Sequence, residues 1–408
     1  MTGRLSPDIN RHSTLSPSQV VLLQARLVAE LPYTLPLARR IEFHLNHPLS
    51  ETSRIFVAAV VPGQNHEPAA LNDAESAAED AHVRGWLDSW LHEDSSPGTA
   101  LPWLAAHIDL STQGQTQVWV YASWEHPGVG YFSSSVTDLP SVSEEASATV
   151  SETSSIAPAA SLDGEGDPHA QIHEELFNTL FRYIYTDLVP CQPTTPNEDW
   201  LELQRTGKYL SIPYSRDKVL FGTVHEVLWR YFDNTARTRI DPSYLKYVFS
   251  LPTLGPQDTQ DATINREVSL PEGYYLADMR REHLQMVLDR TPIPRTLALL
   301  YQMESLGLFF VDNPTPIGWG FLSKDGSISS LHTEAEHRGR NLAVAVGKGL
   351  LCRGRMISQS KQGVYYGHAD SAQSNIGSRR VMEKLGGVPK WKVAWLEIDL
   401  RALLLASK

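Results

Sequence analysis

The sequence predicts a mixed α/β protein whose C-terminal part has the clearer succession of strands and helices. Three observations support this fold class. The chain has 408 residues, of which 41% are hydrophobic and 20% charged, which is typical of a globular protein with more than one core. Strand and helix patterns alternate from residue 268 onward. A basic turn containing glycine joins one of those strands to a helix of small residues.

Composition excludes several classes of protein. The formal net charge of -12 argues against general nucleic-acid binding. The longest uninterrupted apolar run, residues 55–61, is too short to span a bilayer, and the first residues lack an apolar signal core. Cys191 and Cys352 have neither the number nor the spacing of a disulfide framework or a metal site. We expect a reducing compartment, cytoplasmic or nuclear, and no metal.

The N-terminal half contains shorter and less regular patterns. Leu23, Leu27 and Leu31 predict a helix over residues 20–31, with Ser16 or Ser18 as its cap. The remaining patterns predict strands at 40–46, 55–61, 117–122 and 219–223 and helices at 172–188 and 225–232.

Composition also divides the chain into regions. Residues 133–170 are rich in Ser, Ala and Glu and bury little apolar surface, which predicts a disordered insertion. Prolines and polar residues predict a linker at 251–267. We therefore expect an N-terminal α/β region that covers 20–132 and 171–250, and a separate C-terminal domain over 268–408.

The C-terminal domain reads as an ordered series of ten elements. Strands are predicted at 273–276, 308–311, 317–323, 328–333, 364–368 and 393–398, and helices at 282–288, 295–305, 342–354 and 375–385. An Asp-Gly pair at 325–326 predicts a hairpin turn. The order is therefore β-α-α-β-β-β-α-β-α-β.

The turn after the strand at 328–333 has the properties of an anion site. Between His337 and Ala369 there is no Asp or Glu, while Arg338 and Arg340 precede the helix that begins at Leu342. The first N–H groups of a helix lack internal partners and carry partial positive charge. A strand, a basic turn and a helix N-terminus together favour a phosphate group.

The segment Arg338-Gly339-Arg340-Asn341-Leu342-Ala343 resembles the acyl-CoA pyrophosphate loop of the GNAT acyltransferase superfamily, Gln/Arg-x-x-Gly-x-Gly/Ala. Asn341 stands where that pattern has Gly. The order of elements is similar to the GNAT fold, and Asn375, Ser378, Lys384 and Gly386 have the spacing of its second helix.

Within the superfamily the sequence looks closest to the glycine N-acyltransferase-like branch. The hairpin Pro316-Ile317-Gly318-Trp319, the Asp-Gly turn and the segment Tyr366–Asp370 carry this resemblance. It implies that the N-terminal half is a degenerate GNAT-like α/β unit.

The resemblance implies an acyl-CoA-dependent N-acyltransferase, with acetyl-CoA or another acyl-CoA as co-substrate. Its acceptor would be a small amine, an amino acid or a protein amine. The thioester arm would bind along the backbone of Leu331, His332 and Thr333. The other expected cofactor-binding residues are Arg338, Gly339, Arg340, Asn341, Leu342, Ala343 and Asn375. An amine would attack the thioester carbonyl, and a base would remove its proton.

The general base is left open at this point. Ser327 stands where the glycine N-acyltransferase branch has Glu, and Met382 replaces the usual Tyr acid. The remaining candidates are His332, His368 and Asp370, or a water molecule held by Ser329 or Ser330. Because both usual proton-handling groups are absent, the alternative is a catalytically silent CoA-binding or regulatory module.

Overall fold

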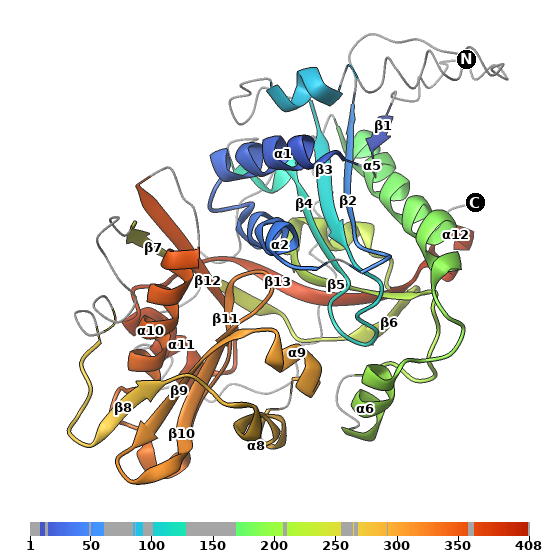
Figure 1. Cartoon of the computed structure of the whole chain (residues 1–408). Coiled ribbons are helices and arrows are strands. Elements are labelled where there is room, and N and C mark those ends of the chain that lie inside the picture. The colour runs from blue at the N-terminus through green and yellow to red at the C-terminus, as the bar shows by residue number, and fades with distance from the viewer. Residues whose placement is uncertain are drawn as a thin grey trace, which may run out of the picture.

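The computed structural model describes residues 9–12, 15–48, 50–60, 85, 87–92, 101–127, 169–206, 210–253, 264, 268–291, 293–357 and 363–406. Within these ranges all thirteen strands belong to one sheet (Figure 1). The strands follow the order β1-β2-β3-β4-β5-β13-β7-β12-β11-β10-β9-β8, and β6 pairs with β13 beside that path.

The N-terminal half contributes the strands at one end of the sheet and the helices beside them. Its strands are β1 (Ile9–His12), β2 (Arg54–Val60), β3 (Trp103–Ile108), β4 (Val118–Ala122), β5 (Lys218–His225), β6 (Arg237–Ile240) and β7 (Tyr244–Pro252). Its helices are α1 (Pro17–Ala29), α2 (Leu35–Asn46), α5 (Ala170–Tyr183) and α6 (Glu198–Thr206). Ser16 caps α1 through a hydrogen bond from the N–H of Gln19, as the sequence predicted.

The C-terminal half has the predicted order of elements. Its strands are β8 (Tyr274–Ala277), β9 (Glu304–Phe310), β10 (Asn313–Leu322), β11 (Ser327–Thr333), β12 (Val364–Ala372) and β13 (Val388–Asp399). Its helices are α8 (Leu284–Arg290), α9 (Leu297–Tyr301), α10 (Leu342–Ile357), α11 (Ile376–Lys384) and α12 (Leu400–Ala406). From β8 to β13 the succession is β-α-α-β-β-β-α-β-α-β, so the predicted mixed α/β fold is confirmed.

The two halves exchange strands. β7 belongs to the N-terminal half by sequence, yet it lies between β12 and β13 and pairs antiparallel with both. The second part of β13 in turn pairs with β5 and β6 of the N-terminal half. In Figure 1, β13 crosses from the C-terminal half into the N-terminal half as one long ribbon. Each half therefore completes its sheet with a strand from the other.

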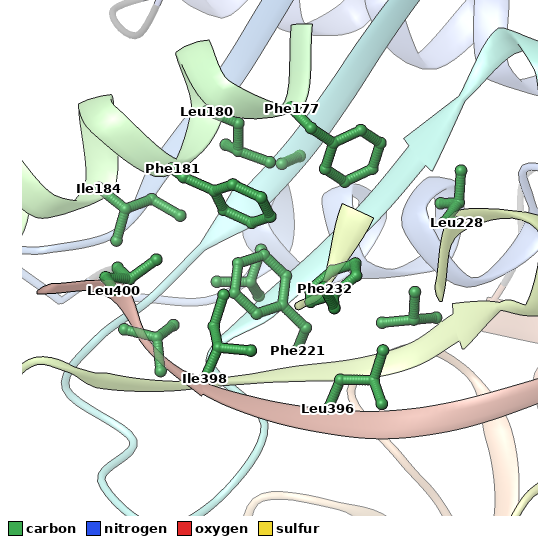
Figure 2. Packing of buried hydrophobic residues seen from close by; sticks show 14 of the residues in the cluster. Phe177, Leu180, Phe181, Ile184, Phe221, Leu228, Phe232, Leu396, Ile398 and Leu400 are labelled. Carbon is green, nitrogen blue, oxygen red and sulfur yellow. The ribbon is translucent and has the colours of Figure 1, made fainter. Parts of the chain in front are cut away.

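A large aromatic core stabilises the contact between β13 and the N-terminal half. Figure 2 shows Phe177 and Phe181 of α5 facing Phe221 of β5 and Phe232, with Leu396 and Ile398 of β13 beneath them. These side chains are all 1% exposed or less. Since burying one such side chain contributes about 1.5–3 kcal/mol, the cluster binds the end of β13 firmly to the N-terminal half.

Some sequence expectations for the N-terminal half are wrong. Residues 40–46 form the end of α2 instead of a strand, because Leu37, Ala38 and Ile41 also give a helical stripe that is buried against the sheet. The helix expected at 225–232 is a short 3₁₀ helix at Glu226–Tyr231, and β5 extends to His225.

Other expectations are extended or left open. Strands β1, β3, β6 and β7 were not foreseen, and β7 reaches Pro252, inside the expected linker. Residues 128–168, and with them nearly all of the expected insertion, lie outside the described part. The division into separate domains therefore stays a prediction.

Among the residues that the structure describes, no helix is both long and apolar enough to cross a bilayer.

Candidate active site

The candidate site begins where two parallel strands separate. β11 and β12 pair only through Ser327 with His368 and Ile328 with Ala369. Beyond those pairs β11 continues to Thr333, bonded on its other side to β10, while β12 continues to Ala372 beside β7. A cavity of about 500 Å³ opens between the separated ends.

A bulge in β11 shapes the edge of this opening. Trp319 of β10 faces His332 and Phe321 faces Ser329, so Ser330 and Leu331 together oppose a single residue of β10. Ser330 has a φ of +50°, a conformation that L-residues rarely adopt. Because the bulge redirects the strand toward the cavity, both residues line it.

The basic turn leads from β11 into the N-terminus of α10. The Arg338 side chain donates to the carbonyl of Thr333 (2.9 Å), which fixes the turn against the end of the strand. Gly339 and Asn341 have φ values of +79° and +58°. Asn341 thus takes the left-handed conformation that glycine adopts readily, which explains how it can replace the Gly of the loop pattern.

Asn341 also organises the start of α10. Its carbonyl accepts the first helical bond, from the N–H of Ala345 (3.1 Å), and its Oδ1 accepts from Nζ of Lys384 on α11 (2.7 Å). Arg340 donates to the hydroxyl of Tyr274 on β8 (2.6 Å). The first turn of α10 carries no acidic residue. This end of the helix is therefore suited to an anion.

The cavity is lined by both halves of the chain. Ser330, Leu331, His332, Asp370, Asn375 and Met382 come from the C-terminal half. The N-terminal half contributes Thr116, Trp119, Leu220, Arg239, Asp241 and Tyr244. An amphipathic wall of this kind can hold a small molecule beside the open edge of β11.

Asp370 is a carboxylate of the cavity wall that forms an ion pair with a lysine. Nζ of Lys246, which β7 brings from the N-terminal half, lies 2.8 Å from Oδ1 and 2.9 Å from Oδ2 of Asp370. Burial raises the pKa of Asp370, while the Lys246 ammonium opposes this rise. The result is a buried carboxylate, held in place, that faces the cavity.

His368 lies behind Asp370, away from the cavity wall. Its Nδ1 is 3.2 Å from Nζ of Lys246, and its Nε2 donates to the carbonyl of Asp325 (2.7 Å). The side chain is 1% exposed, and burial together with the Lys246 charge lowers its pKa to about 3. His368 therefore stays neutral and contacts Lys246, but it does not line the cavity.

His332 does line the cavity, on the opposite strand. Its ring stacks on Trp319 with 4.5 Å between the ring centroids, and Nε2 lies 3.5 Å from Oε2 of Glu334. Burial lowers the pKa of His332, and the neighbouring Glu334 opposes that change. His332 is consequently a neutral imidazole near pH 7.

The structure brings only part of the expected site together around the cavity. Leu331, His332, Asp370 and Asn375 line it, whereas Thr333, His368 and the turn 338–343 do not. Lys246 and Arg295 were missed, since neither belongs to a local motif. Across the described ranges, His, Cys, Asp and Glu side chains form no group of three that could hold a metal ion.

The N-terminal half has a corresponding pair of parallel strands. β4 and β5 pair only through Val118 and Phe221. After β4, the buried Trp124 stacks on His173 with 3.9 Å between the ring centroids. After β5, Nε1 of Trp229 donates to the carbonyl of Val224 (2.9 Å). The ends of these two strands are therefore covered by packed aromatic side chains.

Comparison with known proteins identifies a related family. Residues 7–247 match the family model described as the N-terminal domain of the acyl-CoA N-acyltransferase verG. None of the curated proteins matches the sequence.

Three solved structures resemble the chain at low identity. A Drosophila protein is 13% identical, with 96% of this chain and 99% of that chain covered and a TM-score of 0.49. A tandem GNAT protein from the clavulanic acid biosynthesis pathway is 11% identical, with coverages of 96% and 97% and a TM-score of 0.41. A GCN5-related N-acetyltransferase from Sphaerobacter thermophilus is 12% identical, with coverages of 86% and 97% and a TM-score of 0.36. These TM-scores are too low to support an argument about this chain.

Proposed function

The chain belongs to the acyl-CoA N-acyltransferase family defined by the verG N-terminal domain, and we propose that it transfers an acyl group, in the first place acetyl, from a CoA thioester to an amine in the cavity between β11 and β12. The observation that carries this proposal is the separation of β11 from β12 directly before the basic turn and α10. That arrangement offers a strand edge for the thioester arm and an anion site for its phosphates.

The binding mode follows the polarity of β11. The pyrophosphate would lie at Arg338, Gly339 and Arg340 and at the N-terminus of α10, where partial positive charge and guanidinium groups coincide. The thioester arm would run back along the backbone of Leu331, His332 and Thr333. This direction brings the thioester carbonyl to the bulge at Ser330, beside the cavity.

Asp370 is the general base in this proposal. It faces the cavity, and the Lys246 ammonium, 2.8 Å from Oδ1, favours the ionised carboxylate against the effect of burial. The amine nitrogen attacks the thioester carbonyl carbon and its proton passes to Asp370. The tetrahedral intermediate then collapses, the C–S bond breaks, and CoA leaves as the thiolate. His332 is the second candidate, because it also lines the cavity in its neutral form.

Other parts of the proposal rest on the resemblance described above. They are the place of the chain in the glycine N-acyltransferase-like branch and a mechanism without a metal. The cytoplasmic or nuclear location rests on the two cysteines alone. The alternative function is a module that binds CoA without turnover, which the Ser and Met at positions 327 and 382 favour.

Calorimetric titration with acetyl-CoA, and then with a longer acyl-CoA, tests the proposal. We expect the wild-type chain to bind both thioesters and Arg338→Glu to bind neither. Arg401→Glu, an exposed reversal of charge on α12, is the matched control and should bind normally. Equal affinity in wild type and Arg338→Glu would contradict the proposed binding mode.

Thiol release in the presence of an amine panel separates the enzyme from the silent module. Asp370→Asn should lower turnover by about 10²–10⁴-fold while leaving acetyl-CoA affinity in place, because it removes the proton acceptor and the ion pair with Lys246 but leaves the turn 338–343 unchanged. Binding without turnover for any amine would favour the module.

A further inference from the structure

The cavity wall contains a guanidinium group with no counter-ion of its own. Arg295 precedes α9 and lines the cavity. Within the described part of the chain, its NH1 donates to the carbonyl of the adjacent Pro294 (3.3 Å), and its Nε is buried without a hydrogen-bond partner. Among the residues that the structure describes, no carboxylate lies within ion-pair distance of Arg295.

The other guanidinium groups of the cavity are neutralised. Arg239 forms two contacts with Asp241, of 2.6 and 2.8 Å. Arg290 lies 3.1 Å from Glu334. All three arginines line the cavity, but Arg295 alone among them lacks a carboxylate partner in the described ranges.

Lys324 is a second cation of the same kind. It lines the cavity at the turn between β10 and β11 and has no carboxylate within ion-pair distance in the described ranges. Burial lowers its pKa, as it lowers that of Arg295 to about 10. Since a pKa of about 10 leaves Arg295 cationic near pH 7, this part of the wall carries positive charge.

Asp325 does not fill the role of a counter-ion. Its charge raises the pKa of Arg295, but its Oδ1 accepts from the N–H and the hydroxyl of Ser327 (3.1 and 2.7 Å). Its Oδ2 accepts from Nε1 of Trp119 (3.3 Å). The carboxylate is therefore held by neutral donors and forms no ion pair with the guanidinium in the described ranges.

Arg295 and Lys324 are half-buried, and a cation that gives up part of its hydration without a carboxylate partner destabilises the fold. Departures of this kind are expected at functional sites, where a ligand can supply the missing charge. A guanidinium recognises a carboxylate with two parallel hydrogen bonds, which suits a planar anion in a confined space. We propose that Arg295, assisted by Lys324, binds a carboxylate of the substrate, so that the cavity selects a carboxylate-bearing reactant. This inference rests on the proposed function of the cavity.

The carboxylate can come from either reactant. It can belong to the acceptor, as in an amino acid, or to the acyl group, as in the thioester of a dicarboxylic acid. Two arms of one experiment distinguish these sources. The acceptor arm compares kcat/KM for a panel of α-amino acids with that for their carboxamides. The acyl arm compares the calorimetric affinity of succinyl-CoA with that of butyryl-CoA, which has the same chain length.

Arg295→Gln is the test variant, and Arg280→Gln is the control. Arg280 is exposed and lies outside the cavity, where it pairs with Glu282. Wild type should prefer the carboxylate form in one arm. Arg295→Gln should reduce that preference by roughly tenfold to a hundredfold, since a hydrogen bond between charged groups is lost. Arg295→Lys should retain part of it, and Arg280→Gln all of it.

Acetyl-CoA affinity and melting temperature, measured on the same samples, separate the outcomes. Normal acetyl-CoA binding with no carboxylate preference in either arm overturns the inference and leaves the proposed function standing. An equal preference in wild type and folded Arg295→Gln also overturns it. If the folded wild type binds no acyl-CoA at all, the proposed function is overturned, and this inference falls with it.

Discussion

Nζ of Lys246 lies 2.8 Å from Oδ1 of Asp370, although the two residues are 124 positions apart in the sequence. The pair joins a strand of the N-terminal half to the cavity of the C-terminal half. The carboxylate that faces the cavity therefore takes its counter-charge from the N-terminal half. The two halves consequently share one site.

Lys246→Met should move the acidic limb of the pH–rate profile to higher pH. The ammonium now opposes the rise in the pKa of Asp370 that burial causes. Without it that pKa rises further, so the base is lost by protonation at a higher pH. Lys246→Arg, which keeps the charge, should restore much of the wild-type profile. An acidic limb that does not move in folded Lys246→Met would show that Asp370 is not the base.

Asn341→Val should weaken acetyl-CoA binding at least about tenfold, or about 1.4 kcal/mol, while Asn341→Gly should bind nearly as wild type does. The φ of +58° suits Gly and Asn but strains a β-branched residue. Both variants lose the hydrogen bond from Lys384, so calorimetry on the pair isolates the backbone effect. Equal losses in both would instead assign the effect to that hydrogen bond.

A fragment that contains only residues 268–408 should fail to fold cooperatively. It lacks β7, so β12 and the first part of β13 would lose their shared neighbour, and the rest of β13 would lose β5. Unpaired strand edges of this length favour aggregation. Circular dichroism during heating, with the whole chain as reference, measures this. A sharp melting transition accompanied by acetyl-CoA binding would contradict the expectation.

Stability should fall as the pH drops below about 6.5, partly through His225. Burial, and then the Lys246 charge, lower its pKa to about 3 in the folded chain, against about 6.5 for an unfolded histidine. Between these values the unfolded state binds the extra proton, so acid favours unfolding. The contribution of His225 is complete above about pH 6.5 and is lost toward pH 3, with a slope of at most about 1.4 kcal/mol per pH unit.

Urea denaturation at a series of pH values measures this slope. His225→Asn should make it shallower, since asparagine can still accept the hydrogen bond from the N–H of Val227 but does not titrate. A variant with the wild-type slope would assign the acid sensitivity to other groups.

Local signals explain which parts of the fold could be predicted. In the C-terminal half, the Asp-Gly turn and the Gly after α11 separate short periodic segments, so the order of elements from β8 to β13 could be read directly, whereas α12 was not predicted. Residues 40–46 misled because their short alternation of polar and apolar residues hid the helical stripe that Leu37 and Ala38 form with Ile41. β7 was missed because Lys246 interrupts its apolar pattern, and that lysine is buried only by partners far away in the sequence.

In the candidate site, too, the residues that belong to local motifs could be predicted from the sequence, and the others could not. The turn 338–343 is a continuous motif, and its Arg, Gly and Asn residues have the expected place at the start of α10. Asp370 could be named because it follows the strand predicted at 364–368, although β12 continues to Ala372. Lys246 and Arg295 could not, because their importance depends on charges and cavity walls that only the folded chain brings together.

The strand exchange also constrains how the chain is made. The N-terminal half completes its sheet with residues 393–399, which pair with β5 from Val393 opposite His225 to Asp399 opposite Lys218. During synthesis the N-terminal half of a protein usually folds first. Here the sheet of the N-terminal half cannot be completed at β5 until residues 393–399 have been synthesised. Over that interval β5 is an open edge, and chaperone protection of the nascent chain would matter most there.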